Sequence, residues 1–145
     1  MSEWFDDLGA ISIGCQAYGT DEPYGHLKVG LWQRLCKEMP SVSIGPVRHL
    51  ALALRVGGKF KDFSKVQITH TRVMAKKGYV GCDIEIPSSK YVGLESADIR
   101  QRLRTFVIDG VENLLEALKK KRFEGNYDEV LASFKNTCRT WELNQ

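Results

Sequence analysis

The segment HLALALRV, residues 49–56, decides the class of fold, because its leucines alternate without interruption with smaller or polar residues. The three leucines would point to one face of a strand, and Arg55 and the two alanines to the opposite face. Gly57 and Gly58 follow directly and would end the strand. The segment therefore predicts a strand that is buried on one face only.

Three further strands are predicted around this segment. Residues 65–74 are rich in β-branched side chains, and residues 79–86 alternate between an aliphatic face and a polar face. Another alternating segment, residues 10–18, precedes them. The connection at residues 76–78 is tight, and its glycine would supply a positive φ. Sequential strands with short connections predict an antiparallel meander, in which 49–56 pairs with 65–74 and 65–74 pairs with 79–86.

Three helices are predicted from apolar residues that recur every three or four positions. The first follows Pro23 and ends before Pro40, the second runs from Ser96 to about residue 121, and the third spans 127–141. The last two helices would cover the leucine face of the strand 49–56. The predicted fold is α+β: an antiparallel sheet of about four strands covered on one face by helices, a two-layer sandwich within a single domain spanning residues 1–145.

The four cysteines indicate a reducing compartment. Cys15, Cys36, Cys82 and Cys138 form no CxxC pair, and no histidine lies at a metal-ligand spacing from them. Each lies within an apolar pattern, so we expect buried free thiols. No apolar run approaches the roughly 18 residues that a membrane span needs, and the N-terminus lacks a signal-peptide pattern. These features predict a cytoplasmic protein that does not contact a membrane.

The histidines give no sign of catalysis. His26 and His49 lie at predicted element boundaries, and His70 shares the strand parity of Ile68, so we expect His70 to be partly buried and hydrogen-bonded. No GxSxG, HExxH or P-loop motif is present in the sequence. We therefore predict a binding protein and not an enzyme, with no catalytic residue, no metal site and no cofactor.

The polar face of the strand 79–86 is the main candidate for partner binding. Tyr79, Asp83 and Glu85 would project together, and Arg55 would lie on the same side of the sheet. An open face with one aromatic residue and mixed charges suits a protein partner. The alternative is a solvated face on which arginine and glutamate merely pair across strands.

Charge is unevenly distributed, although the net charge is only +3. Residues 1–25 hold five acidic residues and no Lys or Arg, whereas residues 55–77 hold seven basic residues and one acidic residue. A segment of one sign can steer a partner of the opposite sign. The acidic segment adds four candidate partner-binding residues: Asp6, Asp7, Asp21 and Glu22.

The segment GYVGCDIEIP, residues 78–87, followed by a loop and a long helix from Ser96, resembles bacterial immunity proteins of contact-dependent inhibition and related polymorphic toxin systems. The likeness covers roughly residues 65–121 and consists of a basic hairpin turn, an aliphatic strand, a proline stop and a leucine-rich helix. It implies a cytoplasmic antidote that binds a toxin C-terminal domain, with Asp83 at the matching position. Immunity proteins against nucleases are usually acidic, so a nuclease partner would have to meet the acidic N-terminal quarter of this slightly basic chain.

Two other functions stay open. The basic stretch 55–77 could serve a nucleic-acid-binding or regulatory module, and a small enzyme with an unrecognised site is the third option. Nucleic acid is the less favoured partner, because no aromatic residue interleaves the basic run 119–122. A toxin gene immediately upstream would favour the immunity function.

Overall fold

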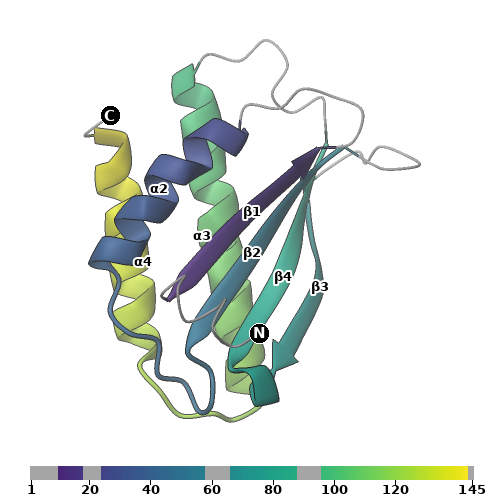
Figure 1. Cartoon of the computed structure of the whole chain (residues 1–145), viewed down its shortest axis with the longest axis vertical. Helices are drawn as coiled ribbons and strands as arrows, with labels where there is room; N and C mark the ends of the chain where they lie inside the picture. Colours follow the sequence, from purple (N-terminus) through teal and green to yellow (C-terminus); the bar gives the residue numbers. More distant parts are fainter. Residues whose placement is uncertain (1–9, 18–23, 58–65, 88–95, 144–145) are drawn as a thin grey trace.

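In the part of the chain that the structure describes, four strands and three α-helices make up an α+β fold, which confirms the predicted class. The computed structural model describes residues 10–17, 24–57, 66–87 and 96–143. In chain order its elements are β1 (Ile11–Ala17), α2 (Tyr24–Glu38), β2 (His49–Val56), β3 (Gln67–Met74), the 3₁₀ helix η1 (Ala75–Lys77), β4 (Tyr79–Ile86), α3 (Ser96–Lys120) and α4 (Tyr127–Leu143) (Figure 1).

The sheet is mixed, with the strand order β1-β2-β4-β3. β1 pairs with β2 and β2 pairs with β4, both in parallel, while β3 and β4 are antiparallel. The predicted pairing of 65–74 with 79–86 is confirmed, but the all-antiparallel sheet and the pairing of 49–56 with 65–74 are wrong. The cause is burial: most of β4 is buried on both faces, whereas no residue of β3 is fully buried. The more apolar strand therefore takes the central position and the polar strand takes the edge.

The described helices α2, α3 and α4 all lie on one side of the strands (Figure 1). α3 packs over β2, β3 and β4, and α2 packs on β1. The chain reaches β2 from β1 through α2, and a parallel crossover of this kind places its helix on the sheet. α4 packs against α2 and α3, so α2 takes the place beside α3 that the sequence pattern assigns to residues 127–141. The leucine face of β2 points toward the helices as predicted, and Leu52 is 2% exposed.

Gly110 allows α3 to approach the sheet closely. A Cβ atom at this position would lie 2.8 Å from Leu52 Cδ2 and 2.9 Å from Ile84 Cδ1. A glycine in a helix interior costs about 1 kcal/mol relative to alanine. Only glycine fits at this position, because the leucine of β2 and the isoleucine of β4 occupy the space that a side chain would need.

Replacing Gly125 by alanine should destabilise the fold by about 1–3 kcal/mol, the usual cost of overpacking. Gly125 forms a β-bridge with Ile44, and an added Cβ would collide with the Ser43 carbonyl oxygen and lie 2.5 Å from Ile44 Cα. Urea denaturation would measure the change. The matched control is Gly14→Ala in β1, where an added Cβ would meet no atom within 4 Å. Equal stability of the two variants would contradict this packing.

Candidate functional site

The candidate site is the face of the sheet that points away from the helices, here called the outer face. None of the helices that the structure describes packs on it. Strand alternation and register place four small residues side by side near its centre: Gly14, Ala51, Ala53 and Gly81. Next to this flat floor stand the polar side chains of β2, β3 and β4. The four residues predicted for this face, Arg55, Tyr79, Asp83 and Glu85, all belong to it by register.

A β-bulge in β3 changes which side chains reach the outer face. Thr69 is opposite Asp83 and Arg72 is opposite Gly81, so two residues of β3 oppose one residue of β4. His70 takes a positive φ of 54° at this point. Thr71 accepts a hydrogen bond of 2.8 Å from Asn113 of α3, so it faces the helices. Without the extra residue, strict alternation after Thr69 would turn His70 and Arg72 toward the helices.

Asp83 is the centre of a cluster with Arg55, His70 and Arg72, here called the Asp83 cluster. Its Oδ2 atom lies 3.1 Å from Arg55 Nε and 3.0 Å from His70 Nδ1, and its Oδ1 atom lies 3.7 Å from Arg72 Nη1. Arg72 also donates a hydrogen bond of 2.6 Å from Nη1 to the His70 carbonyl oxygen, which braces the bulge. These side chains cover the carboxylate, which is only 4% exposed. The prediction of an open, solvated Asp83 is therefore wrong.

The remaining predicted residues of this face are more accessible. Glu85 is half-buried and accepts a hydrogen bond of 3.0 Å from Thr69 Oγ1. Its register neighbour on β2 is Arg55. Tyr79 is half-buried at the start of β4, opposite Met74 of β3. The structure therefore brings Asp83, Glu85 and Arg55 together, while Tyr79 lies four residues away along the strand.

His70 and Arg72 are members of the site that strand parity missed. His70 is 69% exposed on its side chain and lies on the outer face, so the predicted burial of this residue beside Ile68 is wrong. A histidine within a β-branched strand carries no sequence signal for a bulge. The usable signal was the run of polar residues at 69–72, which is unusual for a regular strand next to a buried one.

A second polar contact lies near the other end of the outer face. His49 Nε2 lies 3.0 Å from Ser12 Oγ, and His49 is 3% exposed. The pair joins β1 to β2 across the sheet. A serine hydroxyl beside an imidazole resembles part of a nucleophilic site, yet burial of the ring makes a structural hydrogen bond the simpler account.

The acidic N-terminal candidates Asp6, Asp7, Asp21 and Glu22 lie outside the described residues. Of the basic stretch 55–77, the structure describes Arg55 and Arg72 in the Asp83 cluster and Lys76 and Lys77 in η1, where both lysines are exposed. The two arginines contact a carboxylate and therefore do not form a uniformly basic stripe.

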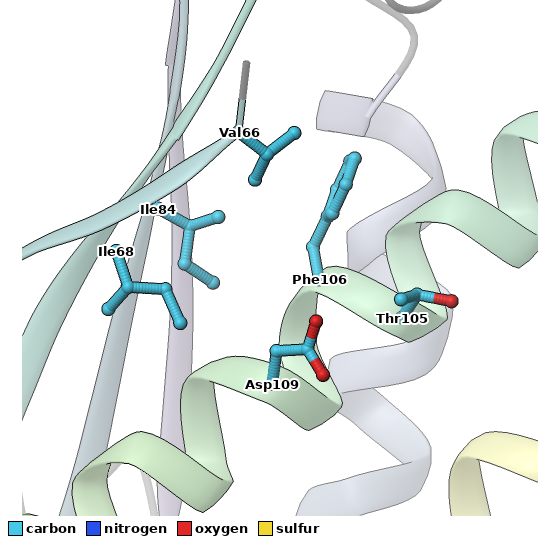
Figure 2. Close-up of a pocket in the computed structure, with 6 residues that line it drawn as sticks. All are labelled: Val66, Ile68, Ile84, Thr105, Phe106 and Asp109. Atoms are coloured by element: carbon cyan, nitrogen blue, oxygen red, sulfur yellow. The ribbon is translucent and has the colours of Figure 1, made fainter.

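A small hollow of about 380 Å³ lies on the helix side of the sheet, between α3 and the strands β3 and β4 (Figure 2). Val66, Ile68 and Ile84 form its strand wall and Phe106 its helix wall, with Thr105 and Asp109 also on the helix. Partial burial raises the pKa of the Asp109 carboxyl above its ordinary value, and the nearby Glu112 carboxylate raises it further. The hollow has the size and lining to hold a small apolar group next to the Asp109 carboxyl.

Asp109→Asn should stabilise the fold at neutral pH and have less effect in acid. The pKa of Asp109 is higher in the folded chain than in the unfolded chain, so the folded state binds more protons between these two pKa values. The free energy of unfolding therefore falls as pH rises through this range. Above this pH range the charged Asp109 carboxylate destabilises the fold to its full extent, and the neutral asparagine side chain removes this effect. Melting temperatures of both proteins between about pH 3 and pH 7 would measure this. A gain that does not depend on pH would contradict it.

The cysteines and acidic groups offer no metal site in the described part of the chain. All four cysteines are free of disulfides. Cys82 and Cys138 are buried, as predicted, and burial raises the pKa of Cys82 to about 11 and that of Cys138 to about 12. Cys36 is exposed, contrary to the prediction, although its Sγ lies 3.9 Å from the Ile11 carbonyl oxygen of β1.

Comparison with known proteins identifies no relative: no family model, no curated protein and no solved structure matches the chain. Among the described helices, none combines the length and the apolar character that crossing a membrane requires.

Proposed function

We propose that this chain is a cytoplasmic immunity-type protein that binds a toxin domain through its outer face and neutralises it by covering a functional surface. The observation that carries the proposal is the position of the Asp83 cluster. A set of fixed, partly exposed charged side chains lies on a sheet face that the described helices leave uncovered. The resemblance of residues 78–87 and the following helix to immunity proteins supplies the kind of partner.

Rigidity favours binding through this face. The cluster is built on β2, β3 and β4, which are joined by backbone ladders, and Asp83 holds its neighbours in place. A partner would therefore pay little entropy to order these side chains. Inhibition would be steric and electrostatic, with no bond made or broken.

The size of the face indicates how much of the chain must take part. At about 4.8 Å between strands and about 3.3 Å per residue, four strands of this length cover roughly 450 Å². A stable interface usually buries about 800 Å² on each partner. The partner would therefore also cover the rim of the sheet.

The test is co-expression with the protein encoded by the neighbouring gene, followed by affinity capture and a toxicity assay. We expect the chain to co-purify with that protein and to restore growth of cells that express it. Arg139→Glu on α4, an exposed site in a helix that packs on α2 and α3, serves as a matched control and should bind normally. Growth rescue without a complex, or a complex without rescue, would contradict inhibition by binding.

A further inference from the structure

The side chains of the Asp83 cluster that a partner can reach are basic. Asp83 itself is 4% exposed, whereas the side chains of Arg55, Arg72 and His70 are 37%, 44% and 69% exposed. Asp83 therefore makes little contact area of its own. Its carboxylate instead fixes two guanidinium groups and one imidazole at the surface.

The geometry also sets how these groups are presented. A carboxylate that already contacts an arginine acts as an acceptor, so His70 donates through Nδ1, and its side chain is 69% exposed. Arg72 Nη2 would lie 3.8 Å from a Cβ at Gly81, so the guanidinium extends over the small-residue floor. The lack of a side chain at Gly81 leaves room for this arrangement.

The bulge is a cost that this arrangement requires. A non-glycine residue with a left-handed backbone conformation is strained. His70 adopts it at the bulge, and the extra residue of the bulge brings both His70 and Arg72 to the outer face. Strain of this kind is concentrated at functional sites, where a bulge redirects a side chain.

Charge on the rim has the same sign. Arg48, Lys76 and Lys77 are exposed at the end of the sheet where β2 and β4 begin. The acidic residues of the outer face are less accessible to a partner. Asp83 is buried, and Glu85 is half-buried and accepts a hydrogen bond from Thr69. Among the described residues, the accessible charge of this face is therefore predominantly basic.

We propose that the Asp83 cluster recognises carboxylate side chains on an acidic surface of the protein partner, with Arg55 and Arg72 as donors and Asp83 as a positioning residue. This rests on the proposed function in that the partner is a protein. Arginine pairs with carboxylates through two parallel hydrogen bonds, which gives both strength and orientation. Asp83 lies between the two arginines, so the cluster is not the uniformly positive track that a nucleic acid selects.

The test uses a blocked tri-glutamate peptide as the probe, titrated into the isotope-labelled full chain and followed by NMR of the arginine Nε–H and histidine ring signals. We expect shifts at Arg55, Arg72 and His70, and none with a blocked tri-glutamine peptide. Arg72→Gln should weaken binding of tri-glutamate by about 5- to 10-fold, the scale of a lost charge-assisted hydrogen bond. The matched control Arg139→Gln should change nothing.

Asp83→Asn separates positioning from simple attraction. It removes a negative charge, so attraction alone would make tri-glutamate bind more tightly. If Asp83 positions the arginines and the imidazole, binding instead weakens, by about 3-fold or more on the scale of one lost contact. Should this variant fail to fold, His70→Gly replaces it, because glycine adopts the φ of 54° without strain. That variant should fold normally and bind tri-glutamate more weakly.

Three results would overturn the carboxylate proposal: no shift at the cluster with tri-glutamate, tighter binding by Asp83→Asn, or stronger shifts at the cluster with oligothymidylate than with tri-glutamate at equal charge. A toxin domain that co-purifies while tri-glutamate leaves the cluster unchanged would refute carboxylate recognition and leave the proposed function standing. Tri-glutamate binding at the cluster without any captured toxin domain would support carboxylate recognition and refute the proposed function.

Discussion

Replacing Phe134 by alanine should lower the free energy of unfolding by about 3–5 kcal/mol, the range for a fully buried aromatic residue. Phe134 is 0% exposed in α4, which packs against α2 and α3. Truncation would leave a cavity between helices that are already constrained by the sheet, so the site has little room to collapse. Chemical denaturation, with the midpoint and slope both recorded, would measure the loss.

The adjacent residue provides the control. Lys135 is 48% exposed on its side chain and pairs with Glu112 at 3.3 Å. An exposed pair of this kind contributes at most about 1 kcal/mol, so Lys135→Ala should cost far less than Phe134→Ala. Similar losses in the two variants would mean that α4 is not packed as described.

Replacing Arg72 by glutamate should lower affinity for the proposed toxin partner by at least about 100-fold, or roughly 2.7 kcal/mol. The change removes a donor and adds a third carboxylate beside Asp83 and Glu85. It would therefore repel the acidic surface that the outer face is proposed to bind. Titration calorimetry, with the purified partner titrated into the wild-type chain or the variant, would measure the change.

Stability shows whether this loss is specific to binding. Arg72 contacts the buried Asp83 and braces the bulge, so its substitution should lower the melting temperature, and the affinities are compared at a temperature where the variant is fully folded. Arg139→Glu makes the same change of charge on α4 and should keep wild-type affinity. Wild-type affinity in a folded Arg72→Glu variant would remove β3 from the interface.

Local structure was predictable because it depends on neighbouring residues. The strands 49–56 and 79–86 match β2 and β4, and Gly78 takes the expected positive φ of 76°. The order of strands was not predictable, because alternation fixes which face a side chain joins but not which strand lies beside it. The burial of both faces of β4, including Gly81 and Asp83, was the missing information.

Asn126 shows the same limit at a helix end. Asn126 directly precedes the last helix, and its Nδ2 donates to Glu129 Oε1 at 2.9 Å. Its Oδ1, however, accepts from the backbone of Ser43, and Nδ2 also donates to the Ser41 carbonyl oxygen. The side chain therefore joins two segments that are distant in sequence, which no local pattern could reveal.

Strand alternation predicted one part of the candidate site and missed the other. Parity correctly placed Arg55, Asp83 and Glu85 on one face. It could not show that His70 and Arg72 join them, because that depends on one extra residue in the pairing of β3 with β4. It also could not show that these side chains bury Asp83, which changes its proposed role from a direct contact to a positioning residue.

The central claim is that the outer face binds the partner, and NMR mapping of the isotope-labelled chain in complex with the co-purified toxin domain tests it most directly. The account predicts the largest shift changes at Arg55, His70, Arg72 and their neighbours on β2, β3 and β4, with the exposed residues of α4 nearly unchanged. Changes confined to the helices, with the signals of the Asp83 cluster as in the free chain, would contradict it.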